Sequence, residues 1–470
     1  MKKIIFSNEK LLKIIYYGLL SMLLLFIILN QFLGNMDEIW NFSFAKNIHD
    51  GLIPYKDFNL ISTPLSCFLN SIILNIDSSL ITFRILYFIY YLTILYLLNN
   101  ILDNLKIKSF LKYIIIFLIV MILVKSCYLD YNFIQIILIL LLINLNLKNE
   151  DYQNNKLNII IPLISGLTII NKQSSGLIIA SVNIILILLN KFIFKKNITL
   201  KFMIKQVIIT LIPPAIFTIY LIITKSFNEF YDLAIIGITS FTNKYVSKTL
   251  LLGISIIYLT IILEMYINKI KSELWILFIY SLASISFVIP ILDKIHTAYS
   301  IIIPFIFLIY IIDNKLKDIN INSMYTYILY PIFIIMIITN INSYSLSTKN
   351  SNGIYKYIPT NNNQQRVIKN VNHYVDNMSK DYDVYILDIS AALFNLNIGK
   401  YNKYFDMFMN GNFGINGEKE IYSIIDSDNK IFMINDVSNH WQKPIKITNY
   451  VKEKYIICGK IEFLTVYCKN

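Results

Sequence analysis

The chain has 470 residues, of which 56% are hydrophobic and only 15% are charged, and its mean hydropathy is +0.58. A soluble chain of this length needs far more polar surface, so the composition excludes a soluble globular protein. The formal net charge is +13, but the lysines alternate with apolar blocks instead of forming one patch, which argues against a nucleic-acid-binding protein.

The apolar residues form blocks of about 18 to 22, long enough to cross a hydrocarbon core of about 30 Å as helices. A helix satisfies its backbone hydrogen bonds internally, as lipid requires. We predict a mainly α-helical, polytopic bundle of about eleven spans. The first is a true span, because its apolar run is too long for a signal peptide and no small-residue cleavage site follows. The spans are placed at residues 12–33, 79–99, 111–125, 132–147, 157–171, 174–190, 204–224, 249–267, 274–292, 299–312 and 324–341.

Lysines are concentrated in alternate loops, including the segments 2–13, 106–112, 191–205, 269–271 and 315–317. The intervening loops are longer yet hold about half as many, an asymmetry that places the lysine-rich loops and the N-terminus in the cytoplasm. These lysines would contact anionic membrane lipids. An odd number of spans then puts the C-terminal region outside, and we expect a transmembrane domain at 1–345 and an extracytoplasmic domain at 346–470.

The predicted first outer loop, residues 34–78, is much longer than a simple connection. Apolar residues recur in it at every fourth position, at Met36, Trp40, Phe44 and Ile48, which predicts a helix. Asn35 is a suitable N-cap, and Gly51 followed by Pro54 supplies the stop. We expect this helix to lie in the outer membrane interface with its polar face turned to water.

The C-terminal region alternates helical and strand-like patterns. Helical spacing from Val367 to Met378 is followed by a strand at 383–388, a helix at 420–425, a strand at 430–435 and a closing hairpin at 455–467. This alternation predicts a small α/β domain. If Gly459 and Lys460 form a two-residue turn, Cys458 and Cys468 do not face each other, so we expect no disulfide between them.

Ionisable residues near membrane spans are costly and therefore are candidates for function. In this chain they gather at the predicted outer ends of the spans. The candidates are Asp37, Glu38, Asp57, Asp130, Lys172, Gln173, Lys294, His296 and Tyr299. Carboxylates and cations on one membrane face could hold a lipid-linked phosphate while a carboxylate takes a proton from an acceptor hydroxyl.

The run from Met36 to Leu65, MDEIWNFSFAKNIHDGLIPYKDFNLISTPL, resembles the first outer loop of bacterial GT-C membrane glycosyltransferases, which include protein mannosyltransferases and aminoarabinose lipid A transferases. The shared features are the Asp37–Glu38 pair, Trp40, Ala45, the G-x-x-P-Y-x-D stretch at 51–57, and Pro64 before the second span. Asp130-Tyr131-Asn132 and Lys172-Gln173 resemble weaker family features. The resemblance covers about residues 10–345, and residues 59–63 depart from the usual loop.

The resemblance implies a bacterial cell-membrane enzyme that transfers a sugar from a polyprenyl-phosphate-linked donor to an extracytoplasmic glycan, lipid or protein. Asp37 would be the general base, assisted or positioned by Glu38 or Asp130. Lys172, His296 and Lys294 would neutralise the lipid phosphate, with Asp57, Gln173 and Tyr299 also contacting substrate. The carboxylates are compatible with a divalent metal ion, but no ligand spacing calls for one.

Plainer interpretations stay open. Asp37 and Glu38 also favour a helix N-terminus, Lys172 could extend from a span end to water, and Asp57 could simply hold its loop together. A transporter or flippase for lipid-linked glycans would carry mid-span charges, whereas we place Arg84 and Glu264 near inner span ends. A glycan polymerase would be expected to have arginines in its outer loops, and a non-enzymatic assembly scaffold is the remaining alternative.

Overall fold

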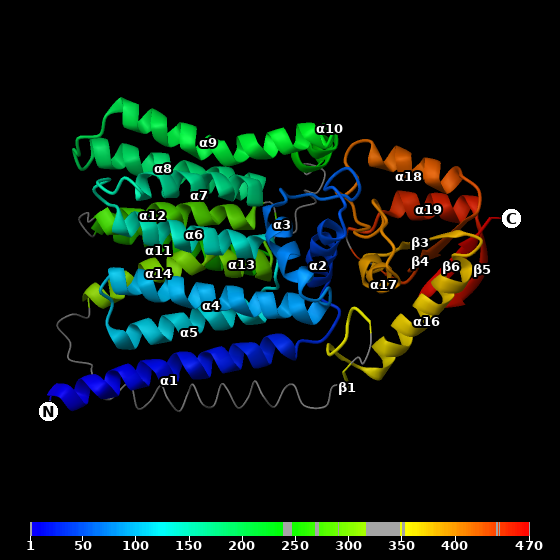
Figure 1. Ribbon diagram of the computed structural model, residues 1–470, viewed down its shortest axis with the longest axis horizontal. Coiled ribbons are helices and arrows are strands. Elements are labelled where there is room, and N and C mark those ends of the chain that lie inside the picture. Colours follow the sequence, from blue (N-terminus) through cyan, green and yellow to red (C-terminus); the bar gives the residue numbers. More distant parts are fainter. Residues whose placement is uncertain are drawn as a thin grey trace.

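The computed structural model describes residues 2–237, 247–267, 272–289, 291–315, 348–349, 353–438, 440 and 442–469. Its long helices lie side by side in a bundle, and a smaller domain with a β-sheet covers one end of that bundle (Figure 1). The chain starts at the opposite end. The bundle helices are α1 (Lys2–Leu29), α4 (Leu80–Asn104), α5 (Ser109–Ser126), α6 (Tyr131–Lys148), α7 (Leu157–Asn171), α8 (Gln173–Phe192), α9 (Leu200–Ile223), α11 (Lys248–Ile267), α12 (Ser272–Ser284) with the 3-10 turn η4 (Ile285–Val288), α13 (Lys294–Ser300) and α14 (Ile302–Lys315).

Within the described residues, five helices are long and apolar enough to cross a membrane, namely α4, α6, α8, α9 and α11. The pair α13–α14, bent by 42°, raises the number to six. The predicted span at 157–171 forms α7, which is apolar but only 15 residues long. The total of about eleven is therefore not confirmed, and the predicted span at 324–341 lies outside the described residues.

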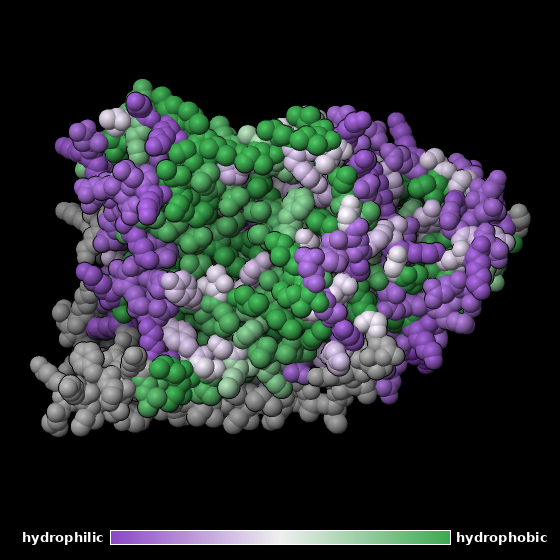
Figure 2. Space-filling view, viewed as in Figure 1, coloured by the Kyte–Doolittle hydropathy of each residue, from purple (hydrophilic) through white to green (hydrophobic). Residues whose placement is uncertain are grey.

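Hydrophobic side chains cover the middle of the bundle, while hydrophilic ones gather at its lysine-bearing end and over the smaller domain (Figure 2). On α9 and α11, large apolar side chains such as Ile216 and Leu252 are more than 60% exposed. A water-soluble protein would hide such a surface, so this band is the surface expected to face lipid.

The predicted helix of the first outer loop is present as α2 (Met36–His49), with Asn35 as its N-cap accepting from the Glu38 amide at 3.1 Å. It is followed by α3 (Leu65–Ser71) and the 3-10 turn η1 (Ile72–Asn75). The expectation that the polar side of α2 faces water is wrong, because Glu38, Asn41 and Asn47 are buried. The reason is that α2 lies between the bundle and the smaller domain, where α17 (Ala391–Ile398) packs on it.

The chain after α9 forms a second segment at the end of the bundle that carries α2. It contains α10 (Phe227–Phe230) and the π-helix η2 (Tyr231–Ile236). The Asp232 carboxylate of η2 accepts from the Ile415 amide of the smaller domain at 3.0 Å. This segment therefore joins the bundle to the smaller domain.

The smaller domain has a four-stranded sheet in the order β3-β4-β6-β5, in which β3 and β4 are parallel and the other pairs antiparallel. The strands and helices after α14 are β1 (Thr348–Lys349), β2 (Pro359–Thr360), α16 (Asn362–Met378), β3 (Asp383–Leu387), α17, α18 (Gly417–Asp426), β4 (Lys430–Ile434), α19 (Ile445–Lys454), β5 (Ile456–Ile461) and β6 (Leu464–Cys468). The predicted helices, strands and hairpin are all present. The local patterns had not indicated α17 or α19.

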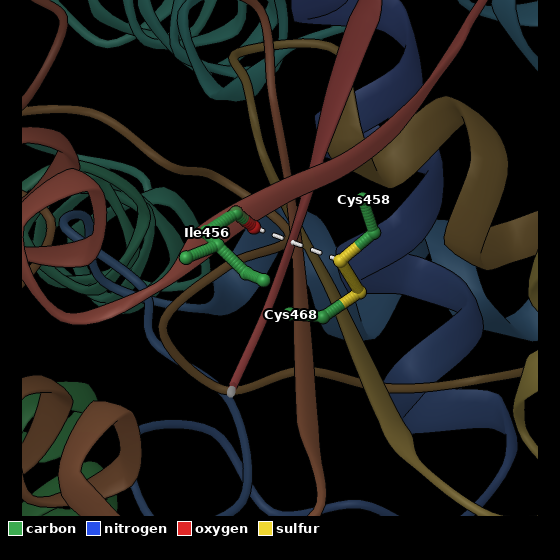
Figure 3. Close-up of a disulfide and its surroundings, with 3 residues drawn as sticks. All are labelled: Ile456, Cys458 and Cys468. Atoms are coloured by element: carbon green, nitrogen blue, oxygen red, sulfur yellow. Dashed lines mark hydrogen bonds between the residues drawn. A yellow bond between two sulfur atoms is a disulfide. The ribbon is translucent and has the colours of Figure 1, made fainter.

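Our expectation for the two C-terminal cysteines is wrong, because Cys458 and Cys468 form a disulfide (Figure 3). The hairpin turns at Glu462 and Phe463 instead of Gly459 and Lys460, so β5 reaches Ile461. Ile456 then pairs with Cys468, and a register shift follows between Ile457 and Gly459. This brings the two cysteine Cα atoms to 5.9 Å, within the usual range for a disulfide.

Candidate functional site

The N-terminal ends of three helices meet where the bundle touches the first outer loop. Asp37 lies in the first turn of α2, Asp130 is the N-cap of α6, and Asp293 is the N-cap of α13. Lys172, between α7 and α8, completes the group. Because helix N-termini carry partial positive charge, they favour carboxylates and would also favour a phosphate group at this place.

Asp130 is held by three hydrogen bonds. Its Oδ1 accepts from the Phe133 amide at 2.8 Å and from the Tyr299 hydroxyl at 2.9 Å, and its Oδ2 accepts from Asn132 at 2.8 Å. Burial raises its pKa, although these hydrogen bonds oppose the shift. The structure thus brings Tyr299 to Asp130, and both are buried and fixed in position.

Asp37 has a different environment from the other acids. Its side chain is half-buried, and its carboxylate makes no hydrogen bond or ion pair with the described residues. Its pKa is raised to about 6, first by burial and then by the negative charge of Asp130, against a lowering by His296. A carboxyl group with free oxygens and a pKa near neutrality is suited to accept a proton.

Glu38 is paired with Arg84 through two hydrogen bonds, Nε to Oε1 and Nη2 to Oε2, each 2.8 Å long. The Arg84 guanidinium is fully buried and also donates to the Gln31 carbonyl oxygen at 2.6 Å. Arg84 therefore lies at the end of α4 that adjoins the loop 34–78, so our placement of it near the lysine-rich end of its span is wrong. The pair fastens α2 to α4.

Lys172 is a buried cation that faces the acids. Its ammonium donates to Asn132 Oδ1 at 2.8 Å and lies over the rings of Tyr131 and Phe287, 5.3 and 5.7 Å from their centroids. Burial lowers its pKa to about 8, and the charge of Asp130 limits that shift. Asn132 bridges Lys172 to Asp130. Only one of the three ammonium donors is used by a described residue, which leaves donors for a ligand.

His296 faces this group from α13. Its Nδ1 lies 2.8 Å from Asp293 Oδ1, and the same oxygen accepts from the His296 amide. Burial opposes ionisation of Asp293, but the hydrogen bonds and charge of His296 outweigh it and lower the pKa of Asp293. Lys294 is exposed, and its side chain makes no hydrogen bond or ion pair with the part of the chain that the structure describes.

Two predicted substrate-binding residues hold loops. The Asp57 carboxylate accepts from the Ile53 amide at 2.8 Å and closes a turn of the first outer loop. The Gln173 amide donates to the carbonyl oxygens of Ile61 and Ala234 and accepts from the Thr63 amide. All polar atoms of Gln173 are therefore occupied by the protein itself.

Sequence patterns did not predict that Arg84, Asn132, Asn171 or Asp293 belongs to the site. Asp293 could have been found, because an Asp three residues before His296 has N-cap spacing. The position of Arg84 could also have been predicted, because the second predicted span begins directly after the first outer loop and Arg84 lies near its start. Among the described residues no group of three or more His, Cys, Asp or Glu is placed to hold a metal ion.

The structure thus combines a bundle of apolar helices, a loop with an acidic pair at one end of that bundle, and a small α/β domain over that loop. No protein-family model matches the chain, and no curated protein matches its sequence. The fold is similar to that of ArnT from Cupriavidus metallidurans in the apo state, with a TM-score of 0.59, 8% identity, and 98% of each chain covered. The same protein bound to undecaprenyl phosphate gives a TM-score of 0.54 and 9% identity over 97% of each chain. The predicted resemblance is thereby confirmed at the level of the fold.

Proposed function

We propose that the protein is a membrane glycosyltransferase that moves a sugar from a polyprenyl-phosphate-linked donor to an extracytoplasmic acceptor. The observation that carries the proposal is the contrast between Asp37, whose carboxylate has no partner among the described residues, and the Lys172 ammonium, whose charge is held close to Asp130. A base and a cation at one site are what this transfer requires. The similar fold of ArnT, solved with undecaprenyl phosphate, supports the choice of lipid.

In the proposed reaction, the acceptor hydroxyl oxygen attacks the anomeric carbon of the sugar. The bond from that carbon to the phosphate oxygen breaks, and its electron pair leaves with the polyprenyl phosphate. Asp37 takes the hydroxyl proton and later releases it to water. Lys172 offsets the charge that develops on the departing phosphate, which lowers the barrier because the site is shielded from water. Glu38 and Asp130 hold α2 and the Lys172 side chain in place.

An apolar cavity supports a donor with a hydrocarbon tail. It has a volume of about 360 Å³ and lies between α3, α7 and α9, with Leu65, Ile170 and Phe217 among its lining residues. Ile170 of this lining is separated from Lys172 by one residue of the chain, and we propose that the prenyl chain of a donor bound at Lys172 extends towards this cavity. The lining is apolar, as a prenyl chain requires.

The test is glycan analysis of the host envelope with the intact protein and with Asp37→Asn at equal membrane abundance. Loss of a general base lowers the rate by about 10²- to 10⁴-fold. We therefore expect one sugar decoration to disappear and its lipid-linked donor to accumulate. An envelope that stays normal with Asp37→Asn, but changes when the whole gene is deleted, would remove Asp37 as the base and favour transport or scaffolding.

Asp50→Asn is the matched control, because Asp50 caps the end of the same helix and, among the described residues, its carboxylate pairs only with Lys46, at an exposed position. A melting measurement distinguishes a variant that has lost its catalytic group from a variant that no longer folds. The pKa of Asp37 is raised in the folded state, so its ionised form opposes folding above about pH 6. Asp37→Asn should therefore melt no lower than the unchanged protein at pH 7.5.

A further inference from the structure

Lys172 is placed by an unusually close junction between two helices. It is the single residue between α7 and α8, and its backbone is extended, with φ −151°. A Cβ on Gly176 would lie 2.0 Å from the Thr168 carbonyl oxygen, so only glycine permits this approach of the two helices. The Lys172 carbonyl oxygen accepts from the Gly176 amide at 2.7 Å. The start of the lysine side chain is therefore fixed relative to α7 and α8.

Asn171, on one side of Lys172, joins the junction to the first turn of α6. Its Nδ2 donates to the Tyr131 carbonyl oxygen at 2.8 Å and to Gln135 Oε1 at 2.7 Å. Both amide side chains are fully buried, and Asn171 Oδ1 and Gln135 Nε2 have no partner among the described residues. Buried polar atoms without partners cost free energy. A contribution to stability therefore does not explain the Asn171–Gln135 pair. Its position does, because the turn of α6 that it holds begins at Asp130.

Gln173, on the other side of Lys172, joins the junction to the first outer loop and to η2. Its Nε2 donates to Ile61 of the first outer loop at 2.9 Å and to Ala234 of η2 at 2.8 Å, and its Oε1 accepts from the Thr63 amide at 3.2 Å. The first outer loop also carries Asp37. One side chain thus connects the segment that holds the cation to the loop that holds the proposed base.

We propose that Asn171 and Gln173 are positioning residues that hold the Lys172 ammonium in register with Asp130 and Asp37. Asn171 sets the junction against α6, and Gln173 sets it against the first outer loop. The positioning itself is a property of the folded chain, and its purpose, to present Lys172 to a lipid phosphate, rests on the proposed function. Neither residue needs to touch the substrate.

The experiment measures how Lys172 titrates, which needs no substrate. The full-length protein in nanodiscs is labelled with an amine-acylating reagent between pH 6 and 11, and the extent at Lys172 is read by mass spectrometry. In the unchanged protein, burial should set the midpoint at about 8. Asn171→Leu and Gln173→Leu should release the ammonium towards water and move the midpoint up by a pH unit or more, so that the fraction of reactive amine at pH 8 falls about fivefold or more.

Asn144→Leu is the matched control. Asn144 is also a buried asparagine of the bundle, but it bonds to Asn104 at the opposite end of α6, so its loss should leave the Lys172 midpoint unchanged. Gln135→Leu removes one of the two acceptors of Asn171 and should shift the Lys172 midpoint by a smaller amount. This variant replaces Asn171→Leu in the test if Asn171→Leu does not fold. Unchanged midpoints in the Asn171, Gln173 and Gln135 variants, or an equal shift in the control, would overturn the inference.

A second measurement separates this inference from the proposed function. Binding of undecaprenyl phosphate and of undecaprenol is compared by native mass spectrometry, so that the difference reports the phosphate alone. We expect the phosphate preference to fall about tenfold in the Asn171 and Gln173 variants while undecaprenol binding is unchanged. If the unchanged protein shows no phosphate preference but the titration shifts occur, the proposed donor is wrong and the positioning role holds.

Discussion

Three carboxylates at the site have three different environments, and the environments decide what each group can do. Asp130 accepts three hydrogen bonds, and Glu38 is paired with Arg84. Asp37 has neither kind of partner among the described residues, and its pKa is raised to about 6. Ionisable groups are tuned by desolvation, charge and hydrogen bonding together, so neighbouring acids in a sequence can have separate roles.

The raised pKa of Asp37 and the lowered pKa of Lys172 predict a bell-shaped dependence of kcat/KM on pH. Asp37 must be ionised to accept a proton, so activity should rise as pH increases through about 6. Lys172 must be protonated to bind phosphate, so activity should fall as pH passes about 8. The two apparent pKa values read from this profile belong to the set of interacting groups and not to Asp37 or Lys172 alone. Transfer rates of the purified protein between pH 5 and 10 measure both.

Lys172→Arg tests the assignment of the alkaline limb. A guanidinium stays charged throughout this range, so the limb near pH 8 should move beyond pH 10 even if the overall rate is lower. An alkaline limb that stays near pH 8 in this variant would show that another group causes it.

At the scale of elements, the acidic helix α2 is held from two sides. The Glu38–Arg84 pair fastens it to α4, and α17 of the smaller domain packs on its other side. The helix itself could be predicted from spacing and its Asn35 cap, which are local. Its burial could not, because the covering residues lie more than 340 positions later in the chain.

We predict strong coupling between Glu38 and Arg84. Removing one partner of a buried ion pair leaves an uncompensated charge and costs about 3–5 kcal/mol, so Arg84→Leu should lower the unfolding free energy by that amount. Glu38→Leu combined with Arg84→Leu should cost less than Arg84→Leu alone. Unfolding of the purified protein in mixed micelles measures both losses.

Asp151→Asn provides the comparison for an exposed pair. Its side chain is 71% exposed and lies 3.0 Å from the Lys196 ammonium, so this change should cost only about 0–1 kcal/mol. If the losses from Glu38→Leu and Arg84→Leu simply add in the double variant, the two side chains are not energetically coupled.

At the scale of the whole molecule, the smaller domain closes over the end of the bundle that carries the site. The Leu33 amide donates to the Pro359 carbonyl oxygen at 3.0 Å, the Leu80 amide donates to Ile354 at 2.9 Å, and Asn59 donates to the Asn412 carbonyl oxygen at 2.6 Å. These contacts hold both ends and the middle of the first outer loop. The site therefore depends on both parts of the chain.

The disulfide gives a test of orientation in the membrane. Disulfides persist in oxidising compartments, so the Cys458–Cys468 bridge fits the proposal that this end faces outside. In intact cells, a membrane-impermeant maleimide should label these cysteines only after an impermeant reductant is added. Lys196→Cys in a background without other cysteines should stay unlabelled, because Lys196 lies at the opposite end. Labelling of Lys196→Cys in intact cells would reverse the proposed orientation.

Four features could be predicted from the amino-acid sequence: the apolar helices, the lysine asymmetry, the capped helix with Asp37, and the alternating elements of the smaller domain. These follow from hydropathy, periodicity and capping, which depend on residues a few positions apart. Only the folded chain shows that Glu38 is paired while Asp37 has no partner among the described residues, and that α2 is buried. It also shows that Asn171 and Gln173, on either side of Lys172, contact three other segments. Desolvation and hydrogen bonding at a site depend on partners tens to hundreds of residues away, and no local pattern records them.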